Sequence, residues 1–445
     1  MVSLHLENLF SISPKQGISF DDLKNASKYL PEYLRRINSK KQGFYQCVDD
    51  EDAIKKIIVY KDKQKGKFAD IVVLGIGGSA LGAICLQQSL LHLYENELKN
   101  NDRPKLHVLD NIDPALIREV EDVIDYKKTL FIVVTKSGTT PETISQFFYF
   151  KKKVEDNKLN AKDHFVFITD AEKGFLKKIS KAEKIESFDI PDNVGGRFSV
   201  LTSVGLLPLA LAGADIEGII SGAKRMRELF LSHEWDANTP FQLATVQYLM
   251  SWKDKNINVL WPYSQRLIKF ADWYRQLLAE SIGKSKSING ETKYIGLTPV
   301  YSLGATDQHS QNQLYNEGPN DKLIMFIEVE ELGPEVVIPN LYPDEADFQY
   351  LDGVSFNELL RVEKKGTEMG LTQNDRPNIT LKVDSVNPKT LGELIMLFEG
   401  AVAFLGEFLE INAFDQPGVE LSKKLTKELL LKKKGGAFYV KKTSA

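Results

Sequence analysis

The sequence contains little cysteine and lacks any long apolar run. Cys47 and Cys85 are its only cysteines, so neither a disulfide framework nor a cysteine-rich metal site can organise the fold. The longest apolar run, residues 204–214, contains Pro208 and is too short to span a bilayer. The first residues also lack the basic and apolar regions of a secretory signal peptide. We therefore expect a cytoplasmic protein with no membrane-spanning segment.

An excess of charge of one sign is also missing. The chain carries 57 basic and 61 acidic residues, a formal net charge of −4, which provides no general attraction to nucleic acid or to an anionic membrane. We expect neither as a partner, and an anionic ligand would need a local binding site. With 445 residues, of which 42% are hydrophobic, the chain is long enough for roughly two or three domains and a large core.

What the sequence does contain is an alternation of short apolar strands and helices. The strands expected are residues 71–74, 106–110, 130–134, 164–169, 257–261, 299–303 and 323–328. The helices expected are residues 80–94, 141 onward, 199–231, 269–280, 390–409 and 419–432. Continuously apolar strands separated by helices predict parallel sheets covered on both faces. A break near residues 189–193 indicates two such units, so the predicted fold class is α/β.

A hydroxyl-rich turn follows the strand at 130–134. Its residues 135–140 are Thr-Lys-Ser-Gly-Thr-Thr, and Pro141 suits the first position of a helix. The free N–H groups and the positive dipole end of that helix favour a bound phosphate. The glycine and lysine spacing of a nucleoside-triphosphate loop is absent. By itself the pattern is equally typical of an ordinary polar turn.

A glycine-rich turn follows the first predicted strand. Residues 75–80, Gly-Ile-Gly-Gly-Ser-Ala, match the G-x-G-x-x-A pattern of dinucleotide-binding proteins. That pattern needs an acidic residue about 20 positions on, and Asp110 lies too far away. Alternatively, Gly77 and Gly78 let the backbone approach a sugar or phosphate while Ser79 donates its hydroxyl. Both turns follow parallel strands, so they would form one crevice for a phosphorylated small molecule.

Two further segments carry candidate chemistry. Arg197, in the sequence Asn-Val-Gly-Gly-Arg-Phe-Ser, would either stabilise negative charge on a substrate oxygen or lie in a solvated turn. Gln276 and Glu280 are spaced i,i+4 on one helix face, and Gly283 would end that helix. The helix dipole disfavours a carboxylate there, which suits a general base. An ordinary surface pair of Glu280 with Lys284 is the simpler interpretation.

His309 and Lys423 are candidates with weaker signals. His309 stands in an unusually polar stretch, residues 304–313, which favours a role in proton transfer, whereas a lone histidine is more often structural. Lys423 lies in a lysine-rich helix that has a leucine at every fourth position. The sequence alone does not distinguish it from Lys424 or Lys427.

Together these motifs resemble the phosphoglucose isomerase (glucose-6-phosphate isomerase) family in its shorter bacterial form. The matching segments are 74–79, 134–143, 195–199, 280–284, 307–309 and 414–423, and they occur in the family order. The last of them, Phe-Asp-Gln-Pro-Gly-Val-Glu-Leu-Ser-Lys, is highly specific. Gly138 and Pro417 stand where longer relatives often have aromatic residues, which bears on loop shape more than on chemistry.

The resemblance implies reversible isomerisation of glucose 6-phosphate and fructose 6-phosphate through a cis-enediolate, a step of glycolysis and gluconeogenesis. Glu280 would move the proton between C2 and C1, and Arg197 would stabilise the enediolate. His309 and Lys423 would open the sugar ring, with His309 reaching the site from the partner subunit of a homodimer. The substrate-binding residues would be Gly78, Ser79, Thr135, Lys136, Ser137, Thr140, Thr143 and Gln276. Such chemistry needs no cofactor and no metal ion.

The resemblance also implies two sugar-isomerase (SIS) domains, each a parallel sheet sandwiched by helices, and a helical C-terminal region. We expect an N-terminal helical segment at 1–65, the first SIS domain with the phosphate-binding loops at 66–192, the second at 193–410, and a C-terminal helix carrying Lys423 at 411–445. The two alternating units of the sequence agree with this division.

Other functions also fit parts of the sequence. An NAD-dependent dehydrogenase would explain the glycine-rich turn but not the hydroxyl-rich one. A non-catalytic SIS module that binds a sugar phosphate would not need Glu280, His309 and Lys423 in their motif contexts. The SIS aminotransferase that makes glucosamine 6-phosphate uses an N-terminal cysteine nucleophile, which this sequence lacks.

Overall fold

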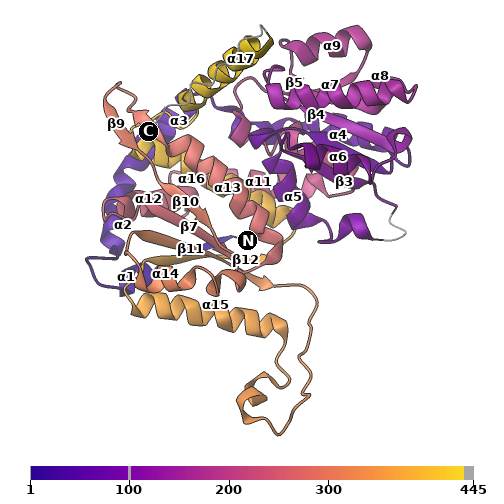
Figure 1. Cartoon of the computed structure of the whole chain (residues 1–445). Coiled ribbons are helices and arrows are strands. Elements are labelled where there is room, and N and C mark those ends of the chain that lie inside the picture. Colours follow the sequence, from indigo (N-terminus) through magenta and orange to yellow (C-terminus); the bar gives the residue numbers. More distant parts are fainter. Residues whose placement is uncertain (1, 99–101, 435–445) are drawn as a thin grey trace, which may run out of the picture.

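Two five-stranded sheets, each flanked by helices, form the framework of the chain (Figure 1). The structure is a computed structural model and describes residues 2–98 and 102–434. The first sheet lies in the purple and magenta part of Figure 1 and the second in the orange part, with several helices between them. Within the two described ranges, no helix combines the length and the hydropathy that crossing a bilayer requires. The predicted α/β class is confirmed.

The first sheet is entirely parallel and has the strand order β3-β2-β4-β5-β6. Its strands are β2 (Asp70–Leu74), β3 (Lys105–Leu109), β4 (Thr129–Val134), β5 (Phe165–Asp170) and β6 (Glu186–Ile190). β2 and β4 are buried along their whole length, as expected for strands covered on both faces. The strand order reverses at β2, because β3 lies on one side of it and β4 on the other. In open α/β sheets such a reversal marks the crevice where ligands bind.

The second sheet has the order β1-β12-β11-β7-β10 and is parallel except for its edge strand β1. Its strands are β1 (Ser3–His5), β7 (Ile257–Pro262), β10 (Thr298–Tyr301), β11 (Lys322–Glu331) and β12 (Asn378–Ser385). β8 (Lys284–Lys286) and β9 (Thr292–Ile295) form a separate antiparallel pair. The sequence pattern does not predict β1, β6 and β12. β1 and β6 are partly exposed edge strands, and β12 interrupts its apolar residues with Thr380 and Lys382.

The helices that cover these sheets begin and end as follows. The N-terminal part contains α1 (Glu7–Ser11), α2 (Phe20–Ala26), α3 (Leu30–Ser39) and α4 (Glu51–Gln64). The first sheet is accompanied by α5 (Leu81–Leu90), α6 (Pro114–Glu121), α7 (Pro141–Asp156), α8 (Ala161–His164) and α9 (Phe175–Glu183). The remaining helices are α10 (Ser203–Leu211), α11 (Ile216–Phe230), α12 (Thr239–Ser251), α13 (Ile268–Ile282), α14 (Asn312–Glu317), α15 (Phe356–Gln373), α16 (Pro388–Phe408) and α17 (Glu420–Lys434).

Some predicted helices are wrong in their bounds. The single helical region expected at 199–231 is divided into α10 and α11, because Gly213 has a φ of +88° and Asp215 caps α11 by accepting from the Gly218 N–H at 2.8 Å. A left-handed residue cannot continue a helix, and a new N-cap starts the next one. α5 ends at Leu90, short of the predicted residue 94. α12 and α15 were not predicted.

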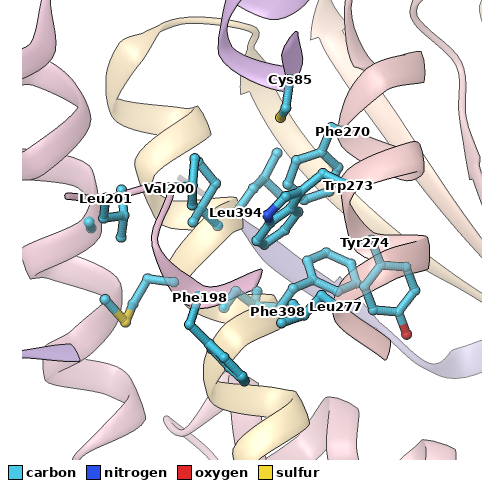
Figure 2. Packing of buried hydrophobic residues seen from close by; sticks show 14 of the residues in the cluster. Cys85, Phe198, Val200, Leu201, Phe270, Trp273, Tyr274, Leu277, Leu394 and Phe398 are labelled. Carbon is cyan, nitrogen blue, oxygen red and sulfur yellow. The ribbon is translucent and has the colours of Figure 1, made fainter. Parts of the chain in front are cut away.

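One hydrophobic core joins the two sheets. α16 is buried along nearly its whole length, as expected for a helix that is largely apolar around its circumference, although Glu393, Glu399 and Glu407 are buried with it. Phe398 of α16 packs against Phe270 and Tyr274 of α13, with ring centroids 5.4 and 4.6 Å apart, and Figure 2 shows these residues in one cluster with Phe198. The same cluster includes Val73 of the first sheet. α13 and the segment around Phe198 are therefore held in one packed layer between the sheets.

The chain crosses between the two units more often than the predicted ranges suggest. β1 lies in the predicted N-terminal helical segment 1–65, yet it pairs with β12 of the second sheet. α10 follows the predicted boundary at residue 193, yet it contacts α4, α5 and β6. β1 and α10 thus pack against elements that lie beyond the predicted boundaries of their own ranges.

Two segments project from this body (Figure 1). α17, in yellow, leaves the body beside α3 and carries exposed Leu421, Leu425 and Leu429. The segment between β11 and α15 extends in the opposite direction and exposes Tyr342 and Tyr350. Part of the predicted C-terminal region, residues 435–445, lies outside the described residues.

Candidate active site

The two sequence-predicted turns lie side by side at the carboxyl edge of the first sheet. β2 leads into the turn at 75–80 and β4 into the turn at 135–140, and the two strands are parallel neighbours in which Leu74 pairs with Val133. α5, which follows the first turn, packs into the core between the sheets, and α7, which follows the second, packs on the opposite face. The turns therefore lie where the strand order reverses, which is the position at which open α/β sheets bind ligands.

The hydroxyl-rich turn is organised by bonds among its own side chains. The Thr135 and Thr140 hydroxyl oxygens lie 2.8 Å apart, and the Ser137 hydroxyl accepts from the Thr139 N–H at 3.2 Å. Thr140 is the N-cap residue of α7 but makes no side-chain cap bond. The Thr143 hydroxyl is buried and has no hydrogen-bond partner among the described residues. The start of α7 therefore combines several hydroxyls with a positive dipole end at this edge of the sheet.

Lys136 is anchored to the segment that follows β6. Its Nζ donates to the backbone carbonyls of Asp192 at 2.6 Å and Val194 at 3.0 Å. Burial lowers the pKa of Lys136, because desolvation penalises the charged ammonium. The lysine thus ties the end of β4 to the segment that leads into Arg197.

The glycine-rich turn touches the two other predicted segments. A Cβ on Gly78 would lie only 2.3 Å from the Gly196 carbonyl carbon and 2.6 Å from the Arg197 nitrogen, so a side chain would clash with that backbone. Gly77 has a φ of +56°, and a Cβ there would lie 3.1 Å from Gln276 Nε2. The absence of side chains lets the turn at 75–80 approach both Arg197 and Gln276.

Arg197 is buried, and every part of its guanidinium is engaged. Its Nε donates to the Ser281 hydroxyl at 2.7 Å. Its Nη2 donates to the carbonyls of Ala413 at 2.6 Å and Asp415 at 3.1 Å, and its Nη1 to Gln416 Oε1 at 3.0 Å. Burial lowers the pKa of Arg197, opposed by the nearby carboxylates. The alternative in which Arg197 lies in a solvated turn is therefore wrong, and the hydrogen bonds hold the cation in one orientation.

The Glu280 carboxylate lies between Arg197 and Gln276. Its Oε1 is 3.4 Å from Arg197 Nη1, and its Oε2 accepts from Gln276 Nε2 at 3.1 Å. The other amide atom, Gln276 Oε1, is buried and has no partner in the described part of the chain. α13 ends before Gly283 as predicted. Lys284 does not pair with the carboxylate but donates to the Glu280 carbonyl at 2.8 Å.

This arrangement suits proton transfer beside a developing oxyanion. The Glu280 side chain is 26% exposed whereas that of Arg197 is 2% exposed, so the carboxylate can reach a ligand while the cation stays fixed. A partly exposed carboxylate can accept a proton from carbon. A preoriented guanidinium stabilises negative charge without reorganising.

The structure does not bring His309 and Lys423 into this cluster. His309 is exposed, and the preceding Gln308 anchors its turn by donating to the Tyr263 hydroxyl at 2.7 Å. Lys423 is exposed on α17, where its Nζ lies 2.8 Å from Glu420 Oε1. Across the described ranges, neither side chain contacts the residues around Glu280 within one chain.

Several residues around the cluster were missed as functional candidates. Ser281 and Lys284 belong to the segment Glu-Ser-Ile-Gly-Lys, and Asp415 and Gln416 to the segment Phe-Asp-Gln-Pro-Gly. A hydroxyl and a cation directly after a candidate base, and an acid–amide pair before a Pro-Gly turn, are the signals in the sequence. Their partners lie far away in the chain, so the sequence does not indicate what they bind.

Solved structures define the class of fold. The chain superimposes on a hypothetical protein from Thermus thermophilus with a TM-score of 0.87 and 33% identity, covering 97% of this chain and 100% of that one. It superimposes on a glucose-6-phosphate isomerase from Chlamydia trachomatis with a TM-score of 0.80, 22% identity and coverage of 93% and 86%. A tagatose-6-phosphate ketose/aldose isomerase from Escherichia coli shares the fold at a TM-score of 0.50 and 13% identity, with coverage of 88% and 95%. The fold is that of the SIS-type phosphosugar isomerases.

Sequence comparisons identify the family. The family model described as phosphoglucose isomerase matches residues 52–442. A glucose-6-phosphate isomerase of Carboxydothermus hydrogenoformans is 46% identical over 427 residues, which cover 94% of this chain and 91% of that protein. One of Rubrobacter xylanophilus is 37% identical over 430 residues, covering 96% and 97%. This chain belongs to the phosphoglucose isomerase family.

Proposed function

We propose that the chain catalyses the reversible isomerisation of glucose 6-phosphate and fructose 6-phosphate through a cis-enediolate. The observation that carries this proposal is the Glu280 carboxylate, which lies 3.4 Å from the buried Arg197 guanidinium. Family membership supports it, as do the names of the relatives. Neither a dehydrogenase nor a non-catalytic module accounts for a base and a cation held together in this way.

Glu280 and Arg197 divide the work of the isomerisation between them. Glu280 removes the proton from C2 of the aldose and returns it to C1, while a second proton passes from O2 to O1, so that the carbonyl group moves from C1 to C2 and the aldose becomes the ketose. Arg197 stabilises the negative charge that develops on the substrate oxygens in between. Gln276 holds the carboxylate through its amide N–H and offers its unpartnered Oε1 to a sugar hydroxyl.

The turns at the edge of the first sheet hold the phosphate in this proposal. The residues involved are Gly78, Ser79, Thr135, Lys136, Ser137, Thr140 and Thr143. Supporting observations are the hydroxyl cluster at the start of α7 and the buried, unpartnered Thr143 hydroxyl. The phosphate does not change during the reaction, so its binding energy serves to position the reacting carbons.

Ring opening would use His309 and Lys423, which requires a second chain. We propose a homodimer in which His309 enters the partner's site. The exposed position of His309 and the exposed leucines of α17 support this assembly, because large apolar side chains on a projecting helix favour association. Under the same proposal the enzyme acts in glycolysis and gluconeogenesis in the cytoplasm. We also propose the domain ranges that the sequence predicts.

A coupled assay tests the proposed function. Purified protein is given fructose 6-phosphate, and glucose 6-phosphate is measured through an auxiliary dehydrogenase, with and without prior exhaustive chelation. We expect turnover that chelation leaves unchanged, since proton transfer by a carboxylate needs no metal. Binding without turnover would favour the non-catalytic module. Activity lost on chelation and restored by a divalent ion would contradict the metal-free mechanism.

A further inference from the structure

Lys284 is a buried cation next to the cluster, and the proposed mechanism assigns it no role. Its side chain is 6% exposed. Its Nζ donates to the backbone carbonyls of Glu280 at 2.8 Å and Asp415 at 2.5 Å, and lies 3.3 Å from Asp415 Oδ1. An ammonium is seldom buried unless it is paired, so these contacts stabilise it in one position.

The acceptors of Lys284 belong to two segments that are far apart in sequence. The Glu280 carbonyl lies in the last turn of α13, where helix carbonyls lack partners and a cation is favourable. The Asp415 carbonyl lies in the segment that holds Arg197, and it accepts from Arg197 Nη2 as well, at 3.1 Å. Asn412 Nδ2 donates to Asp415 Oδ2 at 2.9 Å and steadies the same segment. Lys284 thus links the turn that carries the base to the segment that orients the cation.

The charges around Lys284 show how closely the two cations are held. Burial lowers the pKa of Lys284, and the nearby Arg197 lowers it further, while Asp415 and Glu280 raise it. Two cations that share one carbonyl acceptor repel each other. They stay together because each has its own carboxylate and carbonyl partners. The separation between the base and the guanidinium therefore depends on both cations.

We infer that Lys284 is a positioning residue for the isomerisation, which rests on the proposed function. It holds the last turn of α13 against the segment at 412–416, so that the Glu280 carboxylate and the Arg197 guanidinium face the same reacting carbons. Lys284 acts through these two residues and not through contact with the phosphate turns. Its loss should therefore change the rate of proton transfer and leave phosphate binding intact.

The experiment compares Lys284→Met, Lys284→Arg and the control Lys286→Met in the coupled assay. Methionine keeps the length and the apolar stem but removes the ammonium, whereas arginine keeps the charge. Lys286 lies two residues on in β8 and is exposed. We expect Lys284→Met to lower kcat about 10- to 100-fold, since small misplacements at a reacting centre cost that much. KM for fructose 6-phosphate should change less than about threefold, because uniform substrate binding is untouched.

The rescue variant and the control variant separate a positioning role from a general loss of activity. Lys284→Arg should recover most of the lost kcat, and Lys286→Met should match the wild type. A kcat for Lys284→Met within twofold of the wild type, or a rise in KM alone, would overturn the inference while leaving the isomerase activity established. An inactive wild type would overturn both. If Lys284→Met does not fold, Lys284→Gln, which keeps a polar head but removes the charge, takes its place, and an unchanged kcat in that variant would overturn the positioning role.

Discussion

The cluster around Arg197 and Glu280 and the surface that carries His309 and Lys423 differ in how completely one chain builds them. Arg197 is buried and its guanidinium is bonded on all sides, whereas His309 and Lys423 are exposed. A buried cation must be paired, so the fold fixes its orientation, while an exposed side chain keeps its rotamer freedom. In the proposed mechanism, proton transfer is therefore preorganised within one chain, and ring opening depends on a second chain.

The largest expected effect comes from removing the proposed base, Glu280. Glu280→Gln should lower turnover by about 100- to 10,000-fold and leave sugar-phosphate binding largely intact, because the amide is nearly isosteric with the carboxylate but cannot take a proton from carbon. The measurement pairs turnover with exchange of the C2 hydrogen of glucose 6-phosphate in deuterated water. Glu291→Gln, which changes an exposed glutamate between β8 and β9, is the control. Exchange at the wild-type rate in Glu280→Gln would show that another residue is the base.

Mixing two inactive variants tests whether His309 acts in the site of the partner chain. Glu280→Gln and His309→Asn are each expected to be nearly inactive. Random exchange between their dimers makes half of them hybrids, in which one of two sites has both a wild-type glutamate and a wild-type histidine. We expect activity to rise to about a quarter of the wild-type value, as this symmetry argument implies. No recovery after subunits have exchanged would mean that His309 serves its own chain or has no role.

Lys136→Ala distinguishes two possible roles of Lys136, binding of the substrate phosphate and anchoring of its own turn to the segment at 192–194. If Lys136 binds the phosphate, KM for fructose 6-phosphate should rise about tenfold or more with little change in kcat, since a charged hydrogen bond contributes about 1.5–3 kcal/mol. Its present acceptors are the carbonyls of Asp192 and Val194. A purely structural role would instead lower the melting temperature and leave KM unchanged. Lys173→Ala, an exposed lysine in the same region, controls for the loss of charge.

The smallest expected effect concerns the close approach of two backbones. Gly78→Ala places a Cβ 2.3 Å from the Gly196 carbonyl carbon and should lower the free energy of unfolding by about 1–3 kcal/mol, the usual range for overpacking. Gly196→Ala is the matched control, because a Cβ there meets nothing within 4 Å. Chemical denaturation measures both. Equal stability of the two variants would show that the turn at 75–80 can move away from Arg197.

Local patterns account for the elements around the candidate site that were predicted correctly. The strands β2 and β4 are continuous apolar runs, and the turns after them contain the glycines and hydroxyls that the geometry needs. Pro141 begins α7 as expected, and the i,i+4 spacing of Gln276 and Glu280 produces their hydrogen bond. Each of these features depends on residues within a few positions of one another, where backbone sterics and helical periodicity dominate.

Long-range packing decides what the sequence left open. The sequence does not predict β12, because Thr380 and Lys382 interrupt its apolar residues. Its partner strands, β11 and β1, also come from distant parts of the chain. Whether Arg197 lies in solvent or in the core depends on the segment at 413–416, and the carbonyls that accept from Lys136 lie near residue 193. By itself the sequence determined the α/β class, the turns and the helix that carries Glu280, because short-range preferences encode them. Only the tertiary structure decided which cations are buried and what they bind, because a buried charge takes whichever partners the completed fold brings within reach.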